Sequence, residues 1–127
     1  GPDESTRAAL ANDFAADLLL SIHLNSHHDP LAAGASSYYF EGSNIASEPG
    51  EHLAQLLQEE LTAGGRIDCR AHGKSYPILR ETSMPAVVLE PGFITDPDEV
   101  KVLSDQAGVD DLVTQIMTAL RRYFDEP

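Results

Sequence analysis

The sequence predicts an α/β fold in which a mostly parallel sheet is flanked by helices. Short apolar runs typical of buried strands alternate along the chain with longer stretches whose apolar residues recur at helical spacing. Strands between amphipathic helices favour a layered sheet with helical cover. With 127 residues, of which 42% are hydrophobic, the chain can form one compact domain with a substantial core and is too short for two.

In the first half of the chain we expect helices at residues 5–17 and 49–62, and strands at residues 18–22 and 36–40. Ser5 is a suitable N-cap for the first helix, and Leu10 and Phe14 fall on one of its faces. The run at residues 18–22 is apolar enough to be buried on both faces. Four leucines form the core stripe of the second helix: Leu53, Leu56, Leu57 and Leu61.

In the second half we expect a strand at residues 86–89 and helices at residues 96–104 and 110–124, with short extended pieces around residues 78–79. Pro85 marks the start of the strand, and Asp96 and Pro97 suit the N-cap and first position of the helix that follows. The last helix is predicted to face the core with Leu112, Val113, Ile116, Met117, Leu120 and Phe124.

Two residues with useful chemistry stand where predicted strands end, which is where sites gather in α/β sheets. His23 can serve as a zinc ligand, or it can be a hydrogen-bonded structural histidine. Glu90 follows four apolar residues, so it is either a carboxylate tuned for proton transfer or one half of a buried ion pair, with Arg80 as partner. His27 and His28 allow a second metal site but are more typical of a solvated loop.

Charge and composition exclude several function classes. The formal net charge of −13 would repel phosphate backbones and anionic membranes, so we expect no nucleic-acid partner. No apolar run approaches the roughly 20 residues that a membrane span needs, so we expect no membrane insertion. The single cysteine, Cys69, rules out an internal disulfide.

Three segments together resemble the zinc-dependent N-acetylmuramoyl-L-alanine amidases. Residues 7–25 are similar to the pattern R-x-x-x-A-N…A-D-x-x-x-S-I-H-x-N, and residues 34–40 to G-x-x-x-Y-Y. Residues 79–96 are similar to L-R-x-x-x-M-P-A-V-L-V-E-x-G-F-x-S-N. The order and spacing agree over most of the chain, from about residue 5 to 124.

This resemblance implies a fold, a reaction and a set of roles. The family cleaves the amide between N-acetylmuramic acid and the L-alanine of the peptidoglycan stem peptide, with zinc as cofactor. His23 would be a zinc ligand and Glu90 the catalytic acid/base, and we assign Asn25 and Arg80, in the same motifs, to binding the peptidoglycan or muropeptide substrate. Because peptidoglycan lies outside the cytoplasmic membrane, the parent protein is expected to be exported to the cell wall or a periplasm-like space.

The sequence departs from the family pattern in one respect. The family has two further zinc ligands, a His in a D-P-G-H-G-G turn and a Glu, in a region before the resembling segments, and neither motif occurs here. A catalytic zinc needs about three protein ligands. We therefore expect residues 1–127 to be a single, truncated catalytic domain that lacks the first strands of the family fold; substitution by His27 and His28 is the less favoured explanation.

An inactive, regulatory module is the alternative function. Residues 68–73 resemble a branch of the family found in actinobacteria, in which some members have lost the metal and catalytic residues and act as regulators. Such a module would bind muropeptide or a partner and regulate cell-wall synthesis without turnover. The presence of both His23 and Glu90 favours the enzyme.

Overall fold

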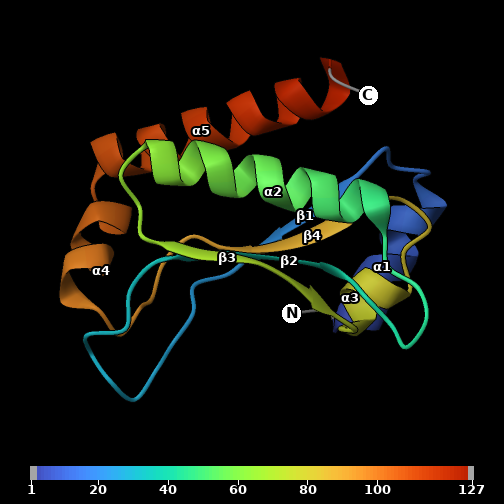
Figure 1. The fold of residues 1–127 in the computed structure, drawn as a ribbon, viewed down its shortest axis with the longest axis horizontal. Helices are drawn as coiled ribbons and strands as arrows, with labels where there is room; N and C mark the ends of the chain where they lie inside the picture. The colour runs from blue at the N-terminus through green and yellow to red at the C-terminus, as the bar shows by residue number, and fades with distance from the viewer. Residues whose placement is uncertain (1–2, 126–127) are drawn as a thin grey trace.

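The computed structural model describes residues 3–125 and confirms the α/β class. Helices and strands alternate along most of the described chain and end in two consecutive helices (Figure 1). In chain order the elements are α1 (Glu4–Asp13), β1 (Leu19–Ile22), β2 (Ala35–Phe40), α2 (Glu48–Ala63), β3 (Asp68–Lys74), α3 (Pro77–Arg80), β4 (Ala86–Glu90), α4 (Pro97–Ser104) and α5 (Gln106–Asp125).

The strands of the described residues form one sheet in the order β1-β4-β2-β3. β1 pairs with β4 and β2 with β3 in parallel, whereas β2 and β4 are antiparallel, so two of the three pairings agree with the predicted mostly parallel sheet. The carboxyl ends of β1 and β4 therefore lie together at one end of the sheet, next to the amino ends of β2 and β3.

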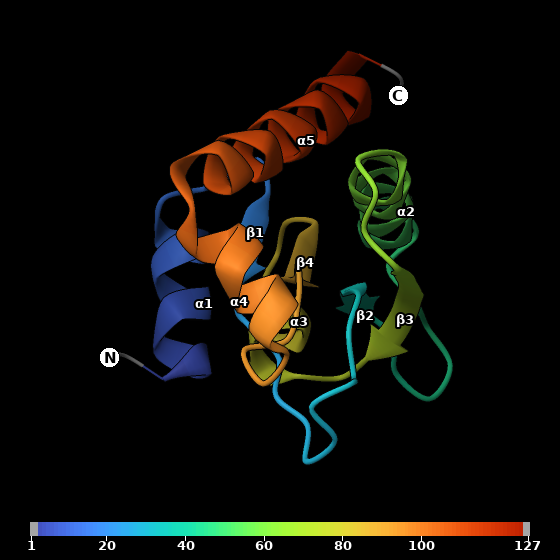
Figure 2. The same ribbon diagram turned by 90° about the vertical axis from the view of Figure 1, so that its left-hand side faces the viewer.

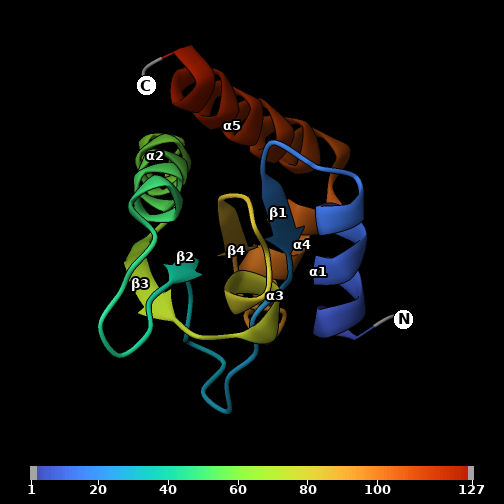
Figure 3. The same ribbon diagram turned by 90° about the vertical axis from the view of Figure 1, so that its right-hand side faces the viewer.

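Helices cover both faces of the sheet. α2 and α5 pack together on one face, and α1 and α3 lie on the opposite side (Figures 2 and 3). The core beneath α2 and α5 includes Leu53, Leu57 and Leu89, which are fully buried. A smaller core beneath α1 and α3 contains Ala8, Ile78, Leu79, Ala86 and Val88. The four predicted leucines of α2 all lie in the core, because their helical spacing points them at the sheet.

The segment between α2 and β4 differs most from the sequence prediction. Residues 68–74 form an edge strand, which the sequence pattern missed because its residues alternate between exposed and half-buried and include a glycine. Residues 78–79, expected to be extended, belong to the short helix α3. Pro77 occupies the first position of that helix, where a proline is well tolerated.

Two smaller expectations were also wrong. α1 begins at Glu4, because Asp3 rather than Ser5 caps it by accepting a 2.8 Å hydrogen bond from the main-chain nitrogen of Thr6. β1 is not buried on both faces: it is an edge strand of the described sheet, and Ile22 is 50% exposed.

The last helix, α5, is longer than predicted and presents a narrower core face. Ile116 and Ala119 are buried against α2 and the sheet, but Val113, Met117 and Phe124 are 52%, 41% and 55% exposed. Its apolar stripe is therefore wider than the surface that the described residues offer it. None of the helices within residues 3–125 combines the length and apolar character that a membrane crossing requires.

Candidate active site

The pairing of β1 with β4 brings His23 and Glu90 together. Ile22 lies opposite Leu89 in the parallel register, and the main-chain nitrogen of His23 donates a 3.0 Å hydrogen bond to the carbonyl oxygen of Leu89. His23 thus directly follows β1, and Glu90 is the last residue of the adjacent strand β4. Because successive side chains alternate between faces of a sheet, both project to the side of α1 and α3.

A hollow of about 200 Å³ lies where these two side chains project. Its walls come from four places in the chain: the first two turns of α1, the end of β1, the residue before α3, and β4. The lining residues are Glu4, Arg7, His23, Tyr76, Val88 and Glu90. The two residues predicted from the sequence therefore share one site, although 67 positions separate them in the chain.

The imidazole of His23 is held by hydrogen bonding at one nitrogen only. Its Nε2 lies 2.7 Å from the hydroxyl oxygen of Ser21, which also accepts a 3.4 Å hydrogen bond from Nη1 of Arg7. Within residues 3–125, Nδ1 of His23 makes no hydrogen bond, and the residue is exposed. An imidazole with one nitrogen anchored and the other open can bind a metal ion or a proton.

Arg7 of α1 also lines this hollow. Its Nε atom is buried and has no hydrogen-bond partner among the described residues. Arg7 lines the hollow together with Glu90, and its guanidinium contacts the Ser21 hydroxyl. A buried N–H without a partner is costly, so the site retains an unmet donor beside its carboxylate.

Glu90 is half-buried and faces Tyr38 of the adjacent strand β2. Burial raises the pKa of the Tyr38 hydroxyl to about 12, with the charge of Glu90 and a hydrogen bond to it as lesser contributions. Tyr38 therefore stays protonated at neutral pH and can donate to the carboxylate. The ring of Tyr38 also packs edge-on against Tyr76 at 6.0 Å, which links it to the wall of the hollow.

The ion pair between Glu90 and Arg80, the alternative that the sequence left open, is not formed. Arg80 ends α3, is exposed, and pairs with Glu81 at 3.4 Å while donating to the carbonyl oxygen of Ser75. It does not line the hollow. The assignment of Arg80 to substrate binding stays a prediction.

Asn25 continues the pairing of the two strands beyond His23. Its main-chain nitrogen donates to Gly92 at 2.9 Å, and its carbonyl oxygen accepts from Ile94 at 2.7 Å. Its side-chain oxygen accepts from the main chain of Ser26, so the side chain is engaged within its own loop. His27 and His28 stack on each other in this loop, with ring centroids 4.2 Å apart, and both are exposed.

The described residues do not supply a complete metal site. Within residues 3–125, no three His, Cys, Asp or Glu side chains are placed to hold one ion. His23 fits as a single ligand, since its Nδ1 is open and its ring direction is fixed, but a catalytic zinc needs about three protein ligands. Zinc binding by residues 3–125 alone is therefore not supported.

Sequence reasoning missed several residues of this site. Arg7 lies within a family-like motif, but nothing in its local pattern indicates that it reaches β1. Tyr38 and Tyr76 lie in or beside family-like segments, but the sequence analysis gave neither of them a role in the site. A further hollow of about 430 Å³ lies beyond Tyr38, over β2 and β3, and is lined by Tyr38, Tyr39, Ala71, His72, Gly73 and Lys74. The alternation of side chains along β2 is the one signal that could have paired Tyr38 with Glu90's face.

An α/β sheet with a histidine and a glutamate at adjacent strand ends is a suitable framework for a hydrolytic site. The profile of the family described as N-acetylmuramoyl-L-alanine amidase matches residues 2–122, and the chain belongs to that family.

Individual relatives agree with this assignment. The chain is 34% identical, over 125 residues, to the N-acetylmuramoyl-L-alanine amidase CwlM of Mycobacterium tuberculosis, covering 97% of this chain and 31% of that protein. It is 30% identical, over 123 residues, to the probable cell wall amidase LytH of Staphylococcus aureus, covering 95% of this chain and 40% of that protein. The chain thus spans less than half the length of these two relatives.

The fold is also that of a solved amidase. The crystal structure of N-acetylmuramoyl-L-alanine amidase from Clostridium difficile 630 superposes with a TM-score of 0.91 at 31% sequence identity. The match covers 98% of this chain and 67% of that structure. The layers and connections described above are therefore those of an amidase catalytic domain.

Proposed function

We propose that this chain is part of a peptidoglycan hydrolase that cleaves the amide between N-acetylmuramic acid and the L-alanine of the stem peptide. The observation that carries the proposal is the meeting of His23 and Glu90 in one hollow, in a chain that belongs to this family. The names of the relatives support the same reaction for proteins of which this chain spans a part.

Glu90 is proposed to move the protons of the reaction. In this proposal, the carboxylate takes a proton from the attacking water and then delivers one to the departing alanine nitrogen. Its position at the end of a buried strand, beside the Tyr38 hydroxyl and on the wall of the hollow, supports this role because it faces the space in which the substrate would lie. Arg7 and Tyr76 would bound the space in which the substrate carbonyl lies.

We further propose zinc as the cofactor and His23 as one of its ligands. Zinc supplies a polarised carbonyl and a water of lowered pKa to a site of this kind. The other ligands would have to come from outside residues 3–125, which supply His23 and no complete set. Asn25 and Arg80 remain proposed substrate contacts, and the substrate implies that the parent protein acts on the cell wall after export.

The test of the enzyme uses the full-length parent protein, with Glu90→Gln as the variant and purified cell wall as the substrate. We expect release of stem peptide to fall by about 10²- to 10⁴-fold, the usual contribution of a general acid/base, with bound zinc unchanged. Glu48→Gln is the matched control, because Glu48 is an exposed carboxylate at the start of α2, on the other side of the sheet. Turnover retained by the Glu90 variant would refute its role.

One observation favours a second candidate, a regulatory module that binds muropeptide without turnover: the incomplete metal site of residues 3–125. Zinc content measured on the full-length parent, and again on its His23→Ala variant, separates the two functions. Stoichiometric zinc that is lost in the variant supports the enzyme. Zinc that is sub-stoichiometric and equal in both, together with saturable muropeptide binding, supports the module.

A further inference from the structure

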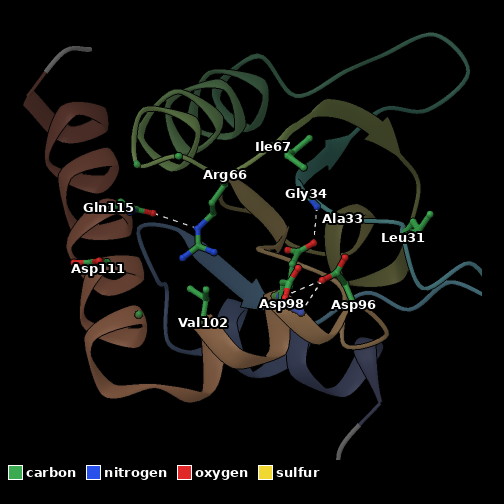
Figure 4. A pocket seen from close by; sticks show the side chains of 14 residues that line it. Leu31, Ala33, Gly34, Arg66, Ile67, Asp96, Asp98, Val102, Asp111 and Gln115 are labelled. Atoms are coloured by element: carbon green, nitrogen blue, oxygen red, sulfur yellow. Dashed lines mark hydrogen bonds between the residues drawn. The ribbon is translucent and has the colours of Figure 1, made fainter.

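A larger cavity, of about 500 Å³, lies away from the His23–Glu90 hollow and shares no lining residue with it. It is bounded by the loop before β2, the turn after α2, α4, and the first half of α5 (Figure 4). Its volume is in the range of sites that bind small molecules. Three regions distant in the sequence (the loop before β2, the turn after α2, and α4 with the start of α5) thus converge on a space for which the proposed amidase chemistry has no use.

The walls of this cavity are held by specific contacts. Glu99 of α4 accepts a 2.7 Å hydrogen bond from the main-chain nitrogen of Gly34, which ties α4 to the loop before β2. At Gly64 a Cβ atom would collide with the amide of Gln115, so the missing side chain lets α5 approach the turn after α2. At Gly108 a Cβ atom would collide with the carbonyl oxygen of Val102. The cavity is therefore a built feature of the packing.

Arg66 brings a cation into this space. Its Nε donates a 3.4 Å hydrogen bond to the side-chain oxygen of Gln115, which orients the guanidinium (Figure 4). The two Nη atoms make no hydrogen bond with any residue from 3 to 125. Burial lowers the pKa of Arg66, and the charges of Glu99 and Asp111 oppose this shift, so the group stays charged. Its outer N–H groups are free to bind a carboxylate in a two-pronged arrangement.

Carboxylates face the same space. Asp96 accepts main-chain hydrogen bonds at the start of α4, and Glu99 accepts one from Gly34. Asp98 and Asp111 are exposed, and their side chains make no hydrogen bond among the described residues. In Figure 4 the guanidinium of Arg66 lies between Asp111 on α5 and Asp98 on α4. A cation and free carboxylates therefore border one cavity without forming an ion pair within 4 Å.

This charge pattern selects among ligand classes. A purely anionic ligand would meet Arg66 but also four carboxylates, and a purely cationic ligand would leave the outer N–H groups of the Arg66 guanidinium without an acceptor. A zwitterion places a carboxylate on the guanidinium and an ammonium on Asp98 or Asp111, so both of its charges are complemented.

We propose that this cavity binds a zwitterionic amino acid or short peptide, through its carboxylate on Arg66 and its ammonium on Asp98 or Asp111. The ligand can be a free amino acid or dipeptide, or the charged end of a peptide attached to cell-wall glycan. The two sources share the chemistry of recognition and differ in size. The proposal concerns binding alone, so it stands or falls independently of the amidase reaction.

The test is an NMR titration of the ¹⁵N-labelled chain with the dipeptides L-Ala-L-Ala and D-Ala-D-Ala. We expect saturable shifts at Gly34, Arg66 and Gln115. N-acetylalanine lacks the ammonium and alanine amide lacks the carboxylate, and we expect each to bind about tenfold more weakly, as the loss of one charge-assisted hydrogen bond predicts. Equal binding of either control, or no saturable shift with any dipeptide, would overturn the proposal.

Substitutions test which side chains bind the two charged groups of the dipeptide. Arg66→Gln should weaken dipeptide binding by about tenfold, and so should Asp98→Asn combined with Asp111→Asn, which removes both candidate partners of the ammonium. Asp105→Asn, an exposed aspartate between α4 and α5 that does not line the cavity, should leave it unchanged. Undisturbed amide spectra away from the cavity establish that each variant is folded. Equal loss in the Asp105 variant would contradict a local site.

A soluble muropeptide with free peptide ends distinguishes the two sources. Displacement of the dipeptide by muropeptide, with the same shifted residues, supports a peptide attached to glycan as the ligand. Saturable dipeptide binding that muropeptide does not displace supports a free small molecule. Shifts that centre on Glu90 instead of Arg66 would show that both compounds bind the other hollow, and would overturn the assignment to this cavity.

Discussion

The hydroxyl oxygen of Ser21 lies 2.7 Å from Nε2 of His23, and both residues belong to the same edge of the sheet. Ser21 is 7% exposed and receives a hydrogen bond from Arg7, so it is a fixed anchor for an imidazole that is otherwise exposed. The contact leaves Nδ1 as the nitrogen that is open to a ligand. The direction of His23 is thus set by a residue two positions earlier, through strand geometry that repeats every second residue.

We expect Ser21→Ala to release the imidazole of His23 without unfolding the chain, because only one hydroxyl is removed from a small side chain. The measurement is the ¹⁵N chemical shift of the His23 ring nitrogens, which should change at Nε2. In the full-length protein, zinc affinity should fall by about 10- to 100-fold, as it does when the hydrogen-bond partner of a metal-bound histidine is lost.

Ser21→Thr is the matched control for this prediction. Threonine retains the hydroxyl and suits a strand, so it should restore the ring shifts of His23. The ring of His52, which lies beside Tyr123 on the far side of the sheet, should be unaffected in both variants. Unchanged His23 shifts in Ser21→Ala would mean that the serine does not anchor the ring.

The raised pKa of Tyr38 predicts a loss of stability at high pH. Its pKa is about 12 in the folded chain, against an ordinary value of about 10, so the unfolded state loses the proton first as pH rises. The stabilising effect of the neutral hydroxyl is therefore complete below about pH 10 and is lost as pH rises towards 12. Urea unfolding at a series of pH values in this interval measures the decline.

Tyr38→Phe has no proton to lose, so its stability should decline less steeply over the same interval. Ultraviolet titration of the folded chain should also show one fewer tyrosine ionising near pH 12 in this variant. Tyr39 should still ionise near pH 12 in this variant, because a hydrogen bond to Glu51, together with burial, raises the pKa of Tyr39 to about 12. Identical slopes for the variant and the parent chain would contradict the burial of Tyr38.

Local signals in the sequence determined the parts of the fold that were predicted correctly. Pro85 and the apolar run after it define β4, and the Asp96-Pro97 pair starts α4 as N-cap and first residue. These signals act between neighbours in the chain, so they need no knowledge of tertiary structure. β3 carries no such signal: four of its seven residues are exposed, and Arg70 has a positive φ, so its pairing with β2 defines it.

The same distinction applies to the site. That His23 and Glu90 lie close together was predictable, because each directly follows an apolar run and strand ends in an α/β sheet lie together. Arg7, Tyr38 and Tyr76 were not, because their approach depends on how α1 packs and on the register between β2 and β4. Residues brought together by register across distant segments leave no trace in local sequence.

Gln58 is a buried polar residue whose removal should destabilise the fold. Its side chain accepts from the Ser37 hydroxyl at 2.8 Å, and donates to the carbonyl oxygen of Ala35 at 2.9 Å and to Asp68 at 2.8 Å. Gln58→Leu keeps the volume but leaves the buried Ser37 and Ala35 groups without this partner. We expect a loss of about 3 kcal/mol in the free energy of unfolding, measured in urea.

Gln55→Leu is the control, because Gln55 lies on the exposed face of the same helix. Its substitution should change the free energy of unfolding by less than about 0.5 kcal/mol. If the two leucine variants were equally stable, the bridge that Gln58 forms between α2 and the strands would contribute nothing.

Gly34 and Gly65 together separate the cost of backbone strain from the cost of a steric clash. Both have positive φ, +121° and +102°, a conformation that alanine adopts only with strain. A Cβ atom at Gly65 meets nothing within 4 Å, so Gly65→Ala should cost only the strain, about 1–3 kcal/mol.

At Gly34 a Cβ atom would lie 2.5 Å from the sulfur of Cys69 and 2.8 Å from the carbonyl oxygen of Ile67. Gly34→Ala should therefore be clearly less stable than Gly65→Ala in urea unfolding, and Gly34→Ala combined with Cys69→Ala should recover part of the difference, because the closest clashing atom is then absent. Equal stability of the two single variants would show that the approach of β3 to Gly34 is looser than the structure has it.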